Sequence, residues 1–194
     1  MAKKEMGIVE KVEGVIRTPG KFFASVASEK SLKPAFVFDA TLTAFYVIVS
    51  YLIGLAGGNS GIAVVVFNWV FSIIVTFLFV GFFHLFIMLL GGKTGYVNTY
   101  KAFVYASTVS LFMLIAMPFA NMGIVGTAIG GLVALAVFVW AVYVTTKGIS
   151  VLQKMSMWKA FASLVLAAIV GLVIIAVAAI AFLWPAISAA VAAA

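Results

Sequence analysis

The chain alternates between long apolar runs and short polar connections. Five runs carry almost no charge; they cover residues 35–55, 62–90, 102–120, 123–146 and 158–184. A helix needs about 20 mostly apolar residues to cross the ~30 Å hydrocarbon core of a bilayer. The runs are continuous and do not alternate with a period of two, so they do not predict barrel strands. The pattern predicts an all-α fold, an integral membrane bundle of five transmembrane helices.

Composition narrows the functional classes. Apolar residues make up 66% of the 194 residues and charged residues 9%, whereas soluble domains average about 45–50% and about 25%. This excludes a soluble enzyme and a nucleic-acid-binding domain. The chain has no Cys, and no acidic side chain follows Asp39. One His and one intramembrane Asp are too few protein ligands for a metal, so we expect no enzymatic activity, no cofactor and no metal site.

The basic residues fall on one side of the expected spans. Seven of the 12 Lys and Arg precede the first run, and the others flank the second and fourth connections. The first and third connections and the C-terminal tail have none. By the positive-inside rule the N-terminus is cytoplasmic and the C-terminus external. We therefore expect a cytoplasmic arm over 1–33, a five-span domain over 34–185 and a short external tail over 186–194.

The arm predicts two short amphipathic helices. Apolar residues recur at helical spacing from Ile8 to Ile16, and Pro19 suits the first position of a second helix. Such helices can lie in the headgroup layer on anionic lipid, pack under the bundle or recruit a partner, and the sequence leaves these alternatives open. The arm residues expected at the lipid interface are Lys4, Lys11, Arg17, Lys21, Phe22 and Phe23.

Ionisable residues inside apolar runs are costly and need partners. Asp39 and His84 both lie near the expected cytoplasmic ends of their runs, and Lys101 flanks the third run. Their similar depth predicts a pair of Asp39 with His84, or else with Lys101. We take Asp39, His84, Lys101 and Tyr105 as the candidate intramembrane polar site. A structural contact and a role in moving a substrate, ion or proton both stay open.

Other polar residues recur at helical spacing on the first two runs. They are Thr43, Tyr46 and Ser50 on the first, and Asn68, Ser72 and Thr76 on the second. Such stripes face other helices in preference to lipid. We expect them to form hydrogen bonds between helices.

Gly58–Gly61 matches the G-x-S-G string of rhomboid-type membrane proteases. A serine nucleophile needs its base within about 3 Å. His84 lies 24 residues beyond Ser60, which is about 36 Å along a helix. We therefore expect no protease activity.

Three blocks carry a resemblance to a known family. They are Pro19 with Phe22, Phe23 and Pro34; the stretch through His84–Phe86, Leu90–Gly95, Thr99–Ala102 and Tyr105–Ser107; and Ser156–Ala160. With these blocks the chain resembles the Yip family, the Ypt- and Rab-interacting membrane proteins, in a compact prokaryotic form. The resemblance implies five spans, a cytosolic N-terminus and the cell membrane of a prokaryote. Because eukaryotic members bind prenylated Rab-type GTPases, it also implies a GTPase-like partner.

These observations predict a non-enzymatic membrane protein with a membrane-organising, trafficking-like or partner-binding role. The alternative is a small transporter, channel or lipid-moving protein that uses Asp39, His84 and Lys101. A hydrated cavity at Asp39 would favour transport, and a dry, paired carboxylate would favour partner binding. We expect membrane lipids, anionic at the cytoplasmic face, as partners; a homo-oligomer stays open.

Overall fold

A computed structural model of the chain describes residues 6–55 and 61–192, and within these ranges all regular structure is helical. The elements are α1 Ile8–Arg17, α2 Pro19–Val26, α3 Lys33–Leu55, α4 Ile62–Leu89, α5 Tyr96–Ala106, η1 Ser107–Phe112, α6 Met113–Ala116, η2 Met117–Asn121, α7 Gly123–Leu152 and α8 Met157–Ala192. Five stretches are long and apolar enough to span a membrane: Lys33–Ile53, Ile62–Leu89, Tyr96–Phe119, Gly123–Leu152 and Met157–Trp184. The predicted all-α fold with five candidate spans is confirmed.

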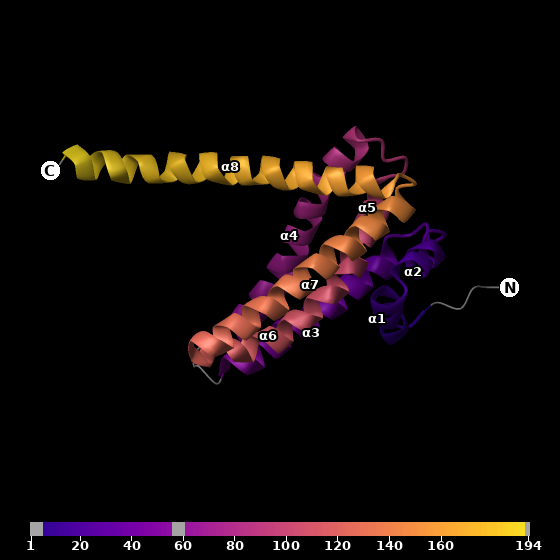
Figure 1. The fold of residues 1–194 in the computed structure, drawn as a ribbon, viewed down its shortest axis with the longest axis horizontal. Coiled ribbons are helices and arrows are strands. Elements are labelled where there is room, and N and C mark those ends of the chain that lie inside the picture. Colours follow the sequence, from indigo (N-terminus) through magenta and orange to yellow (C-terminus); the bar gives the residue numbers. More distant parts are fainter. Residues whose placement is uncertain (1–5, 56–60, 193–194) are drawn as a thin grey trace.

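The helices form a bundle from which one helix departs. α3, α5, α6 and α7 run alongside one another, and α4 packs against α3, α5 and α8 (Figure 1). α8 leaves the end of the bundle where α1 and α2 lie and extends away from the other helices (Figure 1). It has 36 residues, about 54 Å at 1.5 Å per residue, which exceeds the ~30 Å hydrocarbon core.

The third span is not one α-helix. It begins at Tyr96 as α5, becomes the 3-10 helix η1 at Ser107, and ends in the 3-10 helix η2, which contains Pro118. Two serine hydroxyls bond to the backbone where the α-helix becomes a 3-10 helix. Ser107 and Ser110 each donate to the carbonyl three residues earlier, at 2.7 and 2.6 Å. Such local bonds compete with regular helix geometry. The departure from α-helix therefore begins at Ser107, well before Pro118.

Some span ends differ from those expected. The third span begins at Tyr96, six residues before the expected start at residue 102. The expected start followed Lys101, which was expected to flank the run, but Lys101 is buried in protein. α7 runs on to Leu152, and α8 runs on to Ala192 through most of the expected tail.

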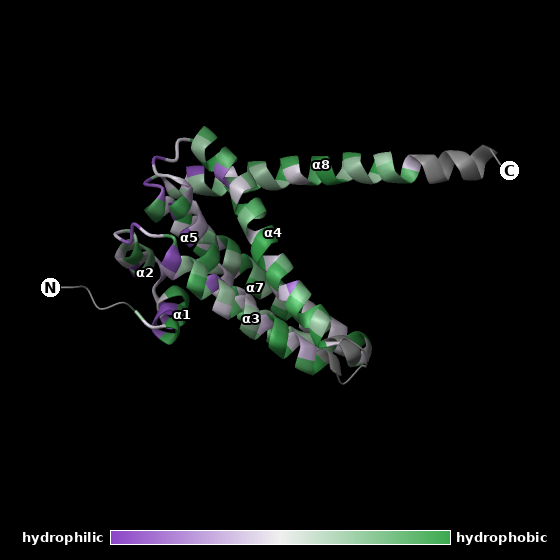
Figure 2. Cartoon of the chain, turned by 180° about the vertical axis from the view of Figure 1, so that it is seen from behind, coloured by the Kyte–Doolittle hydropathy of each residue, from purple (hydrophilic) through white to green (hydrophobic). Residues whose placement is uncertain are grey.

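Polar side chains and the best-packed core gather at one end of the molecule. We call it the basic end; it comprises α1, α2, the connection at residues 90–95 and the connection at residues 153–156. Figure 2 shows hydrophilic residues concentrated there, while the remaining helices are mostly hydrophobic. The largest buried side chains include Phe23 of α2, Phe38 of α3, and Tyr100 and Tyr105 of α5, in the helices at and next to this end. Here the arm, α5 and α7 meet.

Candidate functional site

Asp39 lies in the second turn of α3 with 4% of its surface exposed. Its Oδ2 accepts a hydrogen bond from the Tyr100 hydroxyl at 2.7 Å. The Thr43 hydroxyl lies 3.3 Å from Oδ1 and also contacts the main-chain oxygen of Asp39. Buried polar groups in native proteins are normally satisfied in this way. The carboxyl group therefore ties α3 to α5.

The expected pairs of Asp39 with His84 or Lys101 are wrong. All three side chains are described, and no ion pair joins His84 or Lys101 to Asp39. His84 Nδ1 lies 2.7 Å from Thr99 Oγ1 instead, and its ring meets that of Tyr96 edge-on. The position of a residue along a span sets its depth but not the direction in which the helix turns it. Depth alone was therefore insufficient to choose the partner of Asp39.

Lys101 reaches from α5 to the arm. Its side chain is fully buried, and Nζ donates to the carbonyl oxygens of Val26 and Glu29, at and just beyond the end of α2. The last carbonyls of a helix lack amide partners and carry partial negative charge. The Val26 carbonyl also accepts the Glu29 amide at 3.1 Å, so the buried ammonium group is a second donor to it. Lys101 thus fastens the arm to the third span.

Tyr105 makes a second polar link between the arm and α5. Its hydroxyl donates to Glu29 Oε2 at 3.2 Å and accepts a bond from Lys11 Nζ at 3.4 Å. Lys11 Nζ also lies 5.3 Å from the centroid of the Tyr105 ring, at a cation–π distance. One phenol therefore contacts both α1 and the segment after α2.

Apolar packing holds the same surface. The Phe22 ring lies edge-on to the Tyr105 ring, with centroids 5.1 Å apart. Phe23 packs on α7 at Gly148, where an added Cβ would lie 2.7 Å from the Phe23 ring. Glycine at this position lets α7 approach the arm closely. Of the alternatives for the arm, packing against the bundle is the one that the contacts support.

The expected lipid-interface residues of the arm divide into two groups. Lys11, Phe22 and Phe23 are buried in protein, so the expectation that they contact lipid is wrong. Arg17 and Lys21 are exposed, and Arg17 pairs with Glu13 of its own helix at 3.0 Å. Lys4 lies outside the described residues.

Gln153, which the sequence analysis did not single out, joins three helices. It is fully buried, and its Nε2 donates to Thr99 Oγ1 at 2.8 Å and to the Gly95 carbonyl at 3.2 Å. Its Oε1 accepts the Thr94 amide at 3.0 Å. Because Thr99 also meets His84, a polar chain runs from α4 through α5 to the end of α7. His84 therefore belongs to a different set of contacts from Asp39.

Two glycines after α4 leave room for the polar contacts that link His84, Thr99 and Gln153. An added Cβ at Gly92 would lie 3.0 Å from the Ile87 carbonyl oxygen and 3.1 Å from Gln153 Oε1. Gly91 has a φ of 98°, in the left-handed region that favours glycine. The paired glycines in the sequence were thus the signal that another residue approaches this turn closely.

The remaining stripe residues do not extend the site. Ser72 and Thr76 donate to carbonyls one turn earlier on α4, at 2.7 and 2.9 Å, so they do not make the expected bonds between helices. Tyr46, Ser50 and Asn68 line a cavity of about 240 Å³ between α3 and α4. These residues lie apart from the contacts of Asp39.

Aromatic side chains supply other bonds between helices. Trp69 Nε1 donates to the Ala40 carbonyl of α3 at 2.9 Å, and the Tyr96 hydroxyl donates to the Phe77 carbonyl of α4 at 2.9 Å. Tyr and Trp usually find such partners when their polar ends are buried.

The four candidate residues therefore hold the molecule together. Asp39 binds α5, His84 binds the Thr99–Gln153 chain, and Lys101 and Tyr105 bind the arm. Among the described residues no group of three His, Asp or Glu side chains could hold a metal. Ser60, in the protease-like string, lies outside the described residues.

Comparison with protein-family models matches residues 14–191 to the Yip1 domain. The match begins at residue 14, inside α1, and runs through most of α8, and so includes α2 and all five candidate spans. No curated protein and no solved structure matched in two further comparisons. Since the match extends over nearly the whole chain, the chain belongs to the Yip1 domain family.

Proposed function

We propose that this multi-pass membrane protein is non-enzymatic and binds a protein partner on the surface formed by its arm at the basic end. One observation carries the proposal: Lys101 is fully buried and donates to the carbonyls of Val26 and Glu29. A cation placed among spans is a functional candidate by default. Here its charge is used to fix the arm in place, which supports the arm as the functional element.

The outer face of the docked arm is available for contact. Val9 is 77% exposed and Ile8 is 41% exposed, and the exposed acid Glu10 follows them directly in sequence. Exposed apolar residues bordered by charge are typical of protein interaction surfaces. The positive-inside rule supports a cytoplasmic position for this surface. A GTPase-like protein is the partner class that the family implies.

The transporter alternative receives less support. Its test was a hydrated path to Asp39, yet this side chain is 4% exposed and accepts bonds on both carboxyl oxygens. Lys101 and Tyr105 are fully buried. A group that must exchange a proton or ion with water needs a path that these contacts do not provide.

Photo-crosslinking from the arm tests the proposal. A photoreactive amino acid replaces Val9, and a control replaces Ile124, which is 88% exposed at the far end of the bundle. In native membranes we expect protein adducts at Val9 that are absent at Ile124. Adding Lys101→Met to the Val9 variant should abolish them, because the arm is no longer fixed.

The same experiment identifies the partner class. A GTPase among the adducts, with yield that depends on bound GDP or a GTP analogue, would support the class implied by the family. Adducts with lipid alone at Val9 would overturn partner binding by this surface.

A further inference from the structure

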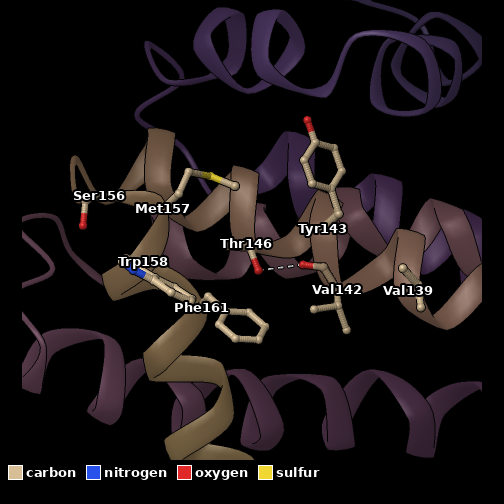
Figure 3. A pocket seen from close by; sticks show the side chains of 8 residues that line it. All are labelled: Val139, Val142, Tyr143, Thr146, Ser156, Met157, Trp158 and Phe161. Atoms are coloured by element: carbon tan, nitrogen blue, oxygen red, sulfur yellow. Dashed lines mark hydrogen bonds between the residues drawn. The ribbon is translucent and has the colours of Figure 1, made fainter.

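The start of α8 stands between two apolar hollows. Figure 3 shows the first, a crevice of about 750 Å³ in which Trp158 and Phe161 of α8 face Val142 of α7. The Thr146 hydroxyl donates to the Val142 carbonyl at 2.7 Å, so it is already used within α7 (Figure 3). The second, about 570 Å³, lies between α8 and Leu90; we call it the Lys159 groove. Trp158 and Phe161 line both hollows.

Lys159 is the only charged residue that lines the Lys159 groove. Its Nζ lies 3.8 Å from the position that a Cβ on Gly91 would occupy, at the basic end of the molecule. The side chain is exposed and makes no ion pair or hydrogen bond with a described residue. An unpaired ammonium group beside an apolar groove complements a ligand with one anionic end and one apolar end.

The length of the groove narrows the ligand further. Its lining runs along α8 from Lys159 to Ile169, ten residues, or about 15 Å of helix. This is half of the ~30 Å hydrocarbon core, the depth of one leaflet. Trp158, 76% exposed beside Lys159, is the residue type that favours the headgroup interface. The groove therefore has the depth of one acyl chain, with its cation at headgroup level.

We propose that the Lys159 groove binds an anionic phospholipid. The phosphate contacts the Lys159 ammonium group, and one acyl chain lies along Ala162, Val165 and Ile169. The second chain lies across the Trp158–Phe161 ridge, in the crevice against α7. A partner helix fits less well, because the groove follows one leaflet and borders an unpaired ammonium group.

Lipid photo-crosslinking tests the site. The full chain is placed in phosphatidylcholine nanodiscs with a trace of either phosphatidylglycerol or phosphatidylcholine, each carrying a diazirine in one acyl chain. Mass spectrometry maps the adducts. We expect phosphatidylglycerol adducts to concentrate on Ala162–Ile169 and to exceed phosphatidylcholine adducts there about five-fold, the ratio expected for one lysine at a headgroup surface.

Two variants and a control separate this site from ordinary lipid contact. Lys159→Gln should remove the preference for phosphatidylglycerol, whereas Lys30→Gln, an equal change of charge at an exposed arm residue, should preserve it. Ala162→Phe, at an exposed position of α8, should fill the groove and lower adducts of both lipids. Adducts spread evenly over α4, α7 and α8 with no headgroup preference would overturn the proposal. So would crosslinking of the groove to a protein in native membranes when the photoreactive group is placed at Ala162.

Discussion

The Tyr100 hydroxyl donates a 2.7 Å hydrogen bond to Oδ2 of Asp39 and joins α5 to α3. Both residues are buried, and Asp39 has no ion-pair partner among the described residues. The acid that depth suggested would meet a cation is instead held by a phenol. Removal of either residue therefore leaves a buried polar group without its main partner.

A double-mutant cycle tests this contact. Tyr100→Phe and Asp39→Leu should each lower the free energy of unfolding in detergent by about 1 kcal/mol, the scale of polar contacts between membrane helices. The double variant should lose less free energy of unfolding than the two single variants added together, because it leaves neither residue as a buried polar group without its partner. Asp39→Leu with His84→Leu is the control and should be additive within about 0.5 kcal/mol. Additivity for Asp39 and Tyr100 would contradict the contact.

Lys101→Met should loosen the arm. The change leaves the Val26 and Glu29 carbonyls without the ammonium donor, and a charged hydrogen bond contributes about 1.5–3 kcal/mol. Hydrogen exchange of the amides in α2 should accelerate about ten-fold or more, while exchange in α7 stays slow. Lys33→Met, at an exposed lysine, should leave α2 exchange unchanged. Equal protection of α2 in wild type and Lys101→Met would rule out this role.

Gly92→Ala and Gly95→Ala should differ sharply. At Gly92 the new Cβ would press on the Ile87 carbonyl and Gln153 Oε1, whereas at Gly95 no atom lies within 4 Å and φ is −74°. We expect Gly92→Ala to lower the melting temperature by several degrees, corresponding to about 1–3 kcal/mol of overpacking. Gly95→Ala should melt within a degree or two of wild type. Equal melting of both variants would argue against the close approach.

Thr108→Val should stabilise the protein. Thr108 is fully buried, and its hydroxyl has no hydrogen-bond partner among the described residues. Valine keeps the shape and removes a buried unpaired group, which should raise the free energy of unfolding by about 1 kcal/mol. Thr99→Val is the matched control. It should lower the free energy of unfolding, because His84 and Gln153 lose their hydrogen-bond partner at Thr99 Oγ1. A loss of stability in Thr108→Val would point to a partner for this hydroxyl.

Single-cysteine labelling tests the orientation of the chain. The sequence contains no Cys, so each introduced thiol is the only one present. In intact cells Gly61→Cys should react with an impermeant maleimide, whereas Lys93→Cys should react only after permeabilisation. Both positions are exposed, so the comparison isolates the side of the membrane. The reverse pattern would show that the basic end faces outward.

The five spans were predictable because, in a chain this apolar, uncharged runs of about 20 or more apolar residues are typical of helices that cross a membrane. Their ends were less predictable where polar residues enter the protein. Lys101 interrupts the hydropathy pattern and suggested a connection, yet it lies inside α5 and is fully buried. Hydropathy predicts transfer into lipid, whereas the surroundings of Lys101 are the carbonyls of the arm. Only knowledge of the docked arm could have corrected this boundary.

The four candidate residues each make a polar contact, but the sequence did not predict their partners. Asp39 contacts Tyr100, His84 contacts Thr99, and Lys101 and Tyr105 contact Glu29 of the arm. Their partners depend on helix rotation, which apolar runs do not specify. Gln153 was missed because one neutral polar residue after a long helix is unremarkable on its own. Its importance comes from the turn at Gly92, sixty-one positions earlier in the chain.

The contact between Phe23 of the arm and Gly148 of α7 also limits when the arm can complete its packing during synthesis. Phe23 rests against Gly148, so its covering surface is synthesised 125 residues later. At about 5–20 residues per second this delay is roughly 6–25 s. Phe22 packs on Tyr105, which is made 83 residues after it, whereas Phe23 lacks its Gly148 contact until the end of this interval. The arm, among the first parts of the chain to be made, therefore completes its packing only after α7 has been synthesised.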